Sequence, residues 1–355
     1  MRSRDVELQA AMASLLGAGL WAGVAVLAGL RRAPFGVIEL LLLFAVLVVV
    51  PLGLNLARLL SFGGEGVGAR FSSILQPVAA IAVVVSFWHR PGTVAAVLSA
   101  PWFVLGVAVA VAGVWNLYRK ETRSLADLAV TVAGVDLAFA SGWLAVSRAG
   151  LHPMGFQEPI VLLTAVHFHY SGFAVALIAA AALRMRDRRA VRIPILTPIV
   201  WLVLFLPAAL AAGFVFSPVL RMLAAVGLAV SVPALAVCLF WIARDLRDRV
   251  ARVYVRLGAV AAWVAMALAG VYAVSDYAGR AFMTMPGMAS THGVLNGIGF
   301  VLCSLLAFSI EMEAAEERLE NGDVPDAVIP VVARKRPAAA VRSLPEFVAR
   351  EFYDR

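Results

Sequence analysis

Apolar residues fill this chain in long continuous blocks rather than in an alternating pattern. A bilayer core of about 30 Å requires about 20 consecutive apolar residues for each spanning helix. Ten blocks meet this requirement and predict spans near residues 8–30, 36–57, 71–88, 93–116, 126–147, 159–183, 193–213, 219–242, 257–277 and 288–310. A transmembrane β-strand would alternate apolar and polar residues, which these blocks do not. We therefore predict an all-α fold, a polytopic transmembrane helical bundle of about ten spans.

The composition agrees with a membrane protein and excludes several other classes. Hydrophobic residues make up 62% of the 355 residues, charged residues make up 15%, and the mean hydropathy is +0.90. In a soluble domain about a quarter of all residues are charged, and these residues cover its surface. A soluble globular enzyme, a disordered regulator and a disulfide-stapled secreted module are thereby excluded, and membrane lipid is the expected surrounding partner.

Lysine and arginine residues are unequally divided between the two sides of the predicted bundle. Seventeen lysine and arginine residues, from Arg2 to Arg256, fall on the side of the N-terminus. Six fall on the other side: Arg31, Arg32, Arg90, Arg148, Arg221 and Arg280. Because such charges resist translocation, we expect the richer side and both termini to be cytoplasmic. The net charge of +8 then reflects topology and attraction to anionic lipid. We expect no nucleic-acid partner, since no folded soluble domain is predicted to carry a basic face.

The chain is predicted to have two parts. Residues 1–310 form the transmembrane helical domain, and residues 311–355 form a cytoplasmic tail. The tail begins with EMEAAEERLE, a solvated continuation of the last span, which Asn321 and Gly322 should end. A Pro-rich, basic stretch follows, and we expect it to be mostly disordered. The tail is too short for an independent catalytic domain.

Candidate chemistry is sought among polar side chains inside the spans, because burying an ionisable group in hydrocarbon costs about 2.5 kcal/mol or more. The deepest candidates are Asp136 in the fifth span, His167 and His169 in the sixth, and His292 and Asn296 in the tenth. At a rise of about 1.5 Å per residue they lie about 6 to 16 Å below the outer boundary. This common depth predicts a single outward-opening pocket formed by the second, fifth, sixth, ninth and tenth spans.

Four further residues are expected to contribute to this pocket. Thr164 and Tyr170 belong to the same sixth span as the two histidines, and Glu39 and Asp276 fall near the predicted mouth. The last two lie close enough to the boundary for their side chains to reach the interface, so interfacial anchoring is the competing interpretation for them.

Helical spacing separates the two histidines of the sixth span. Residues two apart on an α-helix point in nearly opposite directions, so His167 and His169 face different neighbours unless a π-bulge intervenes. His292 and Asn296 are four apart and share a face. Gly293 directly follows His292, and Gly297 directly follows Asn296. The two glycines form a G-x-x-x-G pattern that predicts the close approach of another helix.

The run His-Phe-His-Tyr at 167–170 resembles the same four letters in the catalytic subunit of haem-copper oxidases. In that family the two histidines of one helix serve two haems. This chain has five histidines, too few for a complete oxidase core. The resemblance therefore implies only that His167 or His169 pairs with His292 around one haem iron or another metal ion.

A broader resemblance covers most of the chain. The segments HFHYSGF at 167–173 and THG-x-x-N-G-x-GF at 291–300, with the intervening pattern of spans, resemble the YndJ-like family of bacterial multi-span proteins. This resemblance implies a multi-pass protein of the bacterial cytoplasmic (inner) membrane whose biochemical role is poorly defined. It supports locating function at the histidines of the sixth and tenth spans and at Asn296.

Three functions remain open. The leading hypothesis is an intramembrane enzyme acting on a hydrophobic small molecule, in which His167, His169 and His292 bind a transition metal or haem or act as acids and bases, with Asp136 orienting an imidazole. The second is a proton-coupled secondary transporter, because ten spans with both ends inside divide into two inverted halves of five. The third is a non-catalytic membrane scaffold or sensor.

Structural roles compete with these hypotheses. A buried histidine can simply hydrogen-bond a hydroxyl or carbonyl group, and Asp136 can be a protonated structural acid. No P-loop, G-x-S-x-G or H-E-x-x-H motif occurs in the sequence. ATP-driven transport and standard serine or zinc protease chemistry are therefore disfavoured. The decisive question is whether imidazoles of the sixth and tenth spans meet in one enclosure.

Overall fold

A computed structural model describes residues 3–61, 67–189, 192–280 and 282–320, and its regular secondary structure in these ranges is helical. Residue contacts divide the chain into a unit of 1–312 and a unit of 313–355. Residues 313–320 of the second unit continue the last helix, α13 (Cys303–Glu320). The predicted disordered tail stays a prediction, because 321–355 lie outside the described residues.

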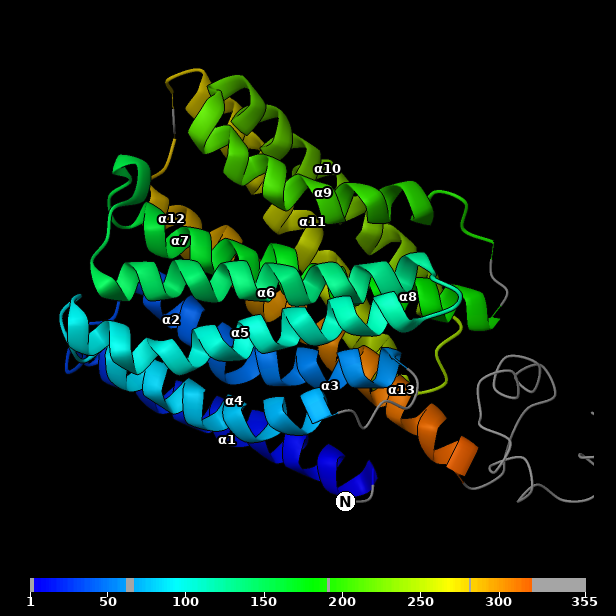
Figure 1. The fold of residues 1–355 in the computed structure, drawn as a ribbon. Coiled ribbons are helices and arrows are strands. Elements are labelled where there is room, and N and C mark those ends of the chain that lie inside the picture. The colour runs from blue at the N-terminus through cyan, green and yellow to red at the C-terminus, as the bar shows by residue number, and fades with distance from the viewer. Residues whose placement is uncertain (1–2, 62–66, 190–191, 281, 321–355) are drawn as a thin grey trace, which may run out of the picture. The chain divides into compact units, whose positions relative to one another are not determined.

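In the part of the chain that the structure describes, ten helical segments follow the ten apolar blocks of the sequence. Figure 1 shows how they are arranged. Seven of them are single helices: α1 (Ser3–Gly29), α4 (Val67–Ser86), α5 (Thr93–Arg119), α6 (Leu125–Ala149), α9 (Leu196–Phe216), α10 (Pro218–Ile242) and α11 (Arg249–Tyr277). Within the described ranges nine segments are long and apolar enough to cross a membrane, and α4 adds the shorter apolar stretch Ile74–Ser86. The predicted all-α fold of about ten spans is confirmed.

The second, sixth and tenth segments change from α-helical to π-helical winding within the span. The second consists of α2 (Val37–Phe44), η1 (Ala45–Val49) and α3 (Val50–Leu60), and the sixth of α7 (Ile160–His167), η3 (Phe168–Ala174) and α8 (Val175–Arg189). The tenth consists of α12 (Met285–Met288), η4 (Ala289–Gly293), η5 (Leu295–Leu302) and α13. Such wide turns are rare and occur frequently at functional sites.

The second and sixth segments form the centre of the bundle. In their most apolar windows 78% and 72% of the residues are buried, compared with 28% for α5 and for α11. The two segments pack closely because Gly53 of α3 has no side chain: a Cβ there would lie 2.5 Å from Cε1 of Phe173 in η3. On the other side, α6 packs against both α5 and the sixth segment.

The start of α6 illustrates how polar residues fix the helix ends. The Ser124 hydroxyl accepts a hydrogen bond from Asp127 N (3.2 Å), and the Asp127 carboxylate accepts one from Ser124 N (3.0 Å), which is a capping box. The same carboxylate pairs with Lys120 and with Arg184 Nη2 of α8 (2.5 Å). Because the Asp127 side chain is only 6% exposed, this cluster joins α6 to α8 in a water-poor environment.

Candidate functional site

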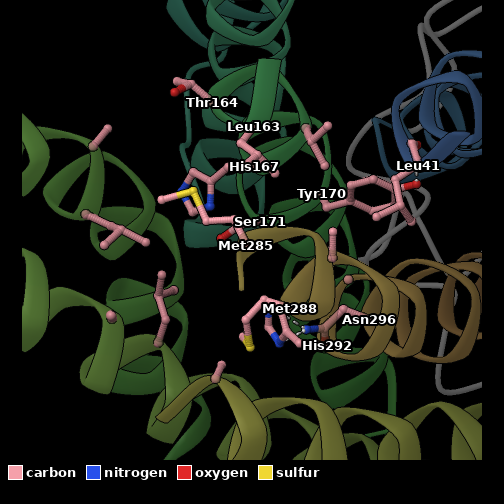
Figure 2. Close-up of a pocket in the computed structure, with 18 of the residues that line it drawn as sticks. Leu41, Leu163, Thr164, His167, Tyr170, Ser171, Met285, Met288, His292 and Asn296 are labelled. Atoms are coloured by element: carbon pink, nitrogen blue, oxygen red, sulfur yellow. Dashed lines mark hydrogen bonds between the residues drawn. The ribbon is translucent and has the colours of Figure 1, made fainter. Parts of the chain in front are cut away.

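A cavity of about 360 Å³ lies among the sixth to tenth segments. It is lined by residues of α7, η3 and α8, of α9, α10 and α11, and of α12, η4 and η5, together with Leu41 of α2 and Trp143 of α6. Figure 2 shows Leu41 beside Tyr170 at its edge. Met154 of η2 (Pro153–Gly155) and Phe156 also line it. Both lie between α6 and α7, on the side that the sequence predicts to be the outer one. The sequence did not predict the contribution of the seventh and eighth segments, α9 and α10.

His167 is the last residue of α7 and its side chain lines the cavity. Its Nε2 lies 3.2 Å from the carbonyl oxygen of Pro207 in α9. A carbonyl oxygen only accepts hydrogen bonds, so Nε2 is the protonated nitrogen. In the neutral ring Nδ1 then keeps a free electron pair. The sixth segment thus presents to the cavity an imidazole that is held from the neighbouring helix.

His169 faces the opposite way, as the helical spacing predicted. Its Nδ1 donates to the carbonyl of Ala165 (2.7 Å), and its Nε2 accepts a hydrogen bond from the indole Nε1–H of Trp102 in α5 (3.1 Å). The Trp indole group can only donate, so the ring is the neutral Nδ1–H tautomer with both nitrogens in use. His169 and Trp102 are fully buried. The structure therefore does not bring His169 to the cavity.

His292 and Asn296 approach the cavity together from the tenth segment, as their spacing predicted. His292 Nδ1 donates to the carbonyl oxygen of Ala265 in α11 (3.0 Å), which leaves Nε2 unprotonated in the neutral ring. The Asn296 amide Nδ2 lies 3.1 Å from Nδ1 and 3.4 Å from Nε2 of the same ring, and 3.4 Å from Sδ of Met266. With Nδ1 protonated, the amide Nδ2–H of Asn296 can donate only to Nε2, and it supports the imidazole from that side.

Tyr170 and the two glycines of the tenth segment bring the second, sixth and tenth segments together. The Tyr170 hydroxyl donates to the carbonyl of Leu41 (2.8 Å), a contact that Figure 2 shows at the cavity edge. A Cβ at Gly293 would lie 2.8 Å from Cδ1 of Leu41, and one at Gly297 would lie 3.0 Å from Cε1 of Tyr170. The close approach predicted from the G-x-x-x-G pattern is confirmed.

Thr164 also lines the cavity, with its hydroxyl bonded to the carbonyl of Ile160 (2.9 Å). Three other predicted site residues do not line it. Asp136 packs against Gly172 on the far side of η3, where a Cβ at Gly172 would lie 2.7 Å from Cβ of Asp136. Glu39 accepts a hydrogen bond from Gly36 N (3.0 Å) and caps α2. Asp276 pairs with Arg221 Nη2 (2.9 Å).

The metal or haem site predicted from three histidines is not assembled in the form expected. His167 and His292 share the cavity, whereas His169 is turned toward Trp102. Within the described ranges no group of three or more His, Cys, Asp or Glu side chains could hold a metal ion. The orienting role expected of Asp136 falls instead to the carbonyl groups of Pro207 and Ala265.

Sequence reasoning missed two features of this region. One is Trp102, which contacts His169 across 67 positions in the chain, a distance at which no local pattern gives a signal. The other is the group of methionines that line the cavity: Met154, Met266, Met285 and Met288. Their spacing on the tenth segment was visible, because Met285, Met288 and His292 are separated by three and four residues.

The ten apolar helical segments found in the described part of the chain, five of which supply nearly all of the cavity lining, define a multi-pass membrane protein. The chain belongs to the YndJ-like protein family, whose family model matches residues 40–300. It is 26% identical over 236 residues to a Bacillus subtilis (strain 168) protein named "Uncharacterized membrane protein YndJ". The match covers 66% of this chain and 41% of the relative, so this chain spans about two fifths of that protein. No solved structure matches the chain significantly.

Proposed function

We propose that the protein is an intramembrane enzyme that acts on a hydrophobic molecule held in the cavity, with His167 and His292 as its proton-transferring groups. The observation that carries this proposal is the presence of two imidazoles in one cavity of about 360 Å³. Each ring is held through one nitrogen by a carbonyl of a neighbouring helix, which leaves the other nitrogen able to accept a proton.

The lining indicates the substrate class. Most of it is apolar and comes from leucine, valine, phenylalanine and methionine side chains. Small-molecule sites of a few hundred Å³ typically combine such a lining with a few polar groups that orient the ligand. Here the polar lining residues are His167, His292, Asn296, Thr164, Ser171, Tyr170 and Tyr272. A molecule with an apolar body and one polar, proton-exchanging group fits this distribution, and it would enter from the bilayer or from the outer face.

Backbone carbonyls supply the preorganisation that acid–base catalysis needs. A hydrogen bond from one ring nitrogen fixes both the tautomer and the ring orientation of a histidine. Pro207 O and Ala265 O do this for His167 and His292. The unprotonated nitrogens are Nδ1 of His167 and Nε2 of His292, the latter 3.4 Å from Asn296 Nδ2, and they are the atoms proposed to exchange protons with the bound molecule.

The proposal can be tested with purified protein in nanodiscs of phosphatidylethanolamine and phosphatidylglycerol. A diazirine-bearing fatty acid or phospholipid should label the cavity lining, and a variant that fills the cavity, Ala269→Phe, should lose that labelling. Lipid extracts incubated with the wild type should then contain a converted species by mass spectrometry. His167→Gln and His292→Gln should each reduce its formation at least about 100-fold, since positioned proton transfer contributes about 10² to 10⁴ in rate.

His89→Gln provides the matched control, because His89 is exposed and lies outside the cavity. Its product formation should equal that of the wild type. Equal labelling of the wild type and the cavity-filled variant would show that the cavity does not hold the hydrophobic probe. Unchanged conversion in both cavity-histidine variants would contradict the acid–base role and favour a scaffold or sensor.

The proposal also includes the location and orientation of the protein. The arginine distribution and the Bacillus subtilis relative support a bacterial cytoplasmic membrane with both termini inside. Fusions of a fluorescent protein and of alkaline phosphatase to the C-terminus distinguish the two orientations. The fluorescent fusion should be active and the phosphatase fusion inactive.

The transporter alternative gains no support from the helix geometry. Inverted-repeat carriers place interrupted helices at equivalent positions of their two halves. In the described ranges the π-helical stretches fall in the second, sixth and tenth segments. If the chain is divided into two halves of five segments, the second segment corresponds to the seventh, the sixth to the first, and the tenth to the fifth. These are the single helices α9, α1 and α6.

A further inference from the structure

An apolar groove of about 580 Å³ runs along the exposed face of α5, outside the cavity described above. Ala108 and Ala112 are half-buried and form its floor, whereas the larger side chains around them are exposed. Those larger residues are Phe103, Val104, Val107, Val111 and Trp115. Only 28% of the most apolar window of α5 is buried in the protein, so this face of the spanning helix lies against lipid.

The groove has the length of one leaflet and ends at an arginine. Val104, Ala108, Ala112, Trp115 and Arg119 follow one another at spacings of four, four, three and four residues, which places them along one face of α5. At about 1.5 Å per residue, the apolar part from Val104 to Trp115 extends about 17 Å. Half of a hydrocarbon core of about 30 Å is about 15 Å. An acyl chain in this groove would therefore have its headgroup near Arg119.

Contacts within the protein hold two guanidinium groups at this end of the groove. The guanidinium carbon of Arg119, the last residue of α5, lies 5.1 Å from the centre of the Trp115 ring. The Trp115 ring stacks with the Tyr118 ring, at 6.3 Å between their centres. Arg123 Nη2 donates to the carbonyl oxygen of Tyr118 (3.2 Å), which brings a second positive charge to the same end of the helix. Tryptophan and tyrosine side chains are typical of the level of the lipid headgroups.

The charges of these two arginines are not neutralised by the protein. Within the described ranges neither forms an ion pair, although the exposed Glu121 lies between them in the sequence. The nearby carboxylate of Asp127 is buried and already pairs with Lys120. An apolar groove with two uncompensated guanidinium groups at one end is complementary to an amphiphile with a negatively charged head.

We propose that this groove binds an anionic phospholipid, with one acyl chain along Ala108 and Ala112 and the phosphate at Arg119 and Arg123. The planar guanidinium group matches the oxygen atoms of a phosphate with two parallel hydrogen bonds. A zwitterionic lipid carries an ammonium group that offsets its phosphate charge, so the site should discriminate against it. This site lies outside the cavity and does not depend on the proposed function.

The test uses the full-length protein in detergent micelles, titrated with phosphatidylglycerol that carries a diazirine in one acyl chain. Phosphatidylethanolamine with the same acyl chain is titrated in parallel. After irradiation, the labelled fraction of residues 103–115 is measured by mass spectrometry of chymotryptic peptides. Labelling should saturate, and phosphatidylglycerol should reach half-saturation at a concentration about 25-fold lower, since each arginine near a membrane surface strengthens the binding of an anionic lipid about fivefold.

The double variant Arg119→Gln/Arg123→Gln should raise the half-saturating concentration of phosphatidylglycerol about 25-fold and leave that of phosphatidylethanolamine within about twofold. Arg31→Gln/Arg32→Gln is the matched control, because it removes the same charge from two exposed arginines between α1 and α2. Its labelling curves should equal those of the wild type. Equal affinity of the wild type for both lipids, or an unchanged phosphatidylglycerol curve in the Arg119→Gln/Arg123→Gln variant, would overturn the proposal.

A second variant tests the groove while both arginines stay in place. Ala108→Leu/Ala112→Leu fills the floor, and it is expected to fold because leucine is a strong helix former and both positions lie on the lipid-facing side of α5. Saturable labelling should be lost with both lipids, whereas Ala22→Leu at an exposed site of α1 should retain it. Retained labelling in the filled variant would contradict the groove as the lipid site. Native mass spectrometry of the same samples gives the oligomeric state. A dimer that only the filled variant dissociates would assign the groove to a second copy of the chain and overturn the lipid site.

Discussion

Replacing Trp102 with phenylalanine would remove the indole N–H that donates to His169 Nε2, while an aromatic ring would remain between α5 and the sixth segment. Both residues have 0% exposed surface, so water cannot replace the lost donor. A buried acceptor left without a partner costs about 1–3 kcal/mol. Measured hydrogen bonds between membrane helices average about 0.6 kcal/mol and reach about 1.7. We therefore expect Trp102→Phe to lower the free energy of unfolding by about 1–2 kcal/mol.

The assay is reversible unfolding in mixed detergent and SDS micelles, followed by tryptophan fluorescence or circular dichroism. Trp115→Phe is the matched control, because Trp115 lies on the same helix and is 54% exposed; its effect should stay within about 0.5 kcal/mol. A double-mutant cycle with His169→Phe should give a coupling of about 0.6–1.7 kcal/mol. If the cycle is additive within about 0.3 kcal/mol, the hydrogen bond contributes nothing and the reasoning fails.

Two further substitutions test the packing of α6. Gly172→Ala should destabilise the protein by about 1–3 kcal/mol, because its Cβ would meet Asp136; Gly142→Ala, whose Cβ would have its nearest neighbour at 3.5 Å, should be much milder in the same unfolding assay. Asp127→Asn should lower the free energy of unfolding by about 3 kcal/mol, since it removes the buried negative charge that pairs with Lys120 and Arg184. Asp187→Asn, at a pair with a 54% exposed carboxylate, should change it by less than about 1 kcal/mol.

The fold was largely predictable from the sequence, because the lipid bilayer imposes a length and a polarity on every span. The apolar blocks located all ten segments, and Ser124 and Asp127 mark the start of α6 as capping rules require. The π-helical stretches were not predictable. No local pattern marks them, and the contacts that η3 makes, such as Phe173 against Gly53, join distant parts of the chain.

The candidate site was predictable only in part. Counting residues along each span predicts a depth for Asp136, His167 and His292, and these depths stay predictions. A depth does not say which way a side chain points. His167 and His292 reached the cavity, whereas Asp136 packs behind η3. The i, i+2 rule correctly separated the two histidines of the sixth segment. The partner of His169 could not be found, since nothing near position 102 distinguishes that tryptophan from one facing lipid.

The wide turns of η3 set the register between the two halves of the sixth segment. Each residue of an α-helix turns the chain by about 100°. A wide turn takes about one more residue than an α-helical turn, so deleting one residue between 168 and 174 would let η3 close into a regular helix while α8 keeps about the same orientation relative to His167. Arg184 should then still reach Asp127. A deletion within α8 ahead of Arg184 has no wide turn to absorb it and would swing Arg184 by about 100° away from Asp127. The sixth segment therefore tolerates a change of length in η3 that it does not tolerate in α8.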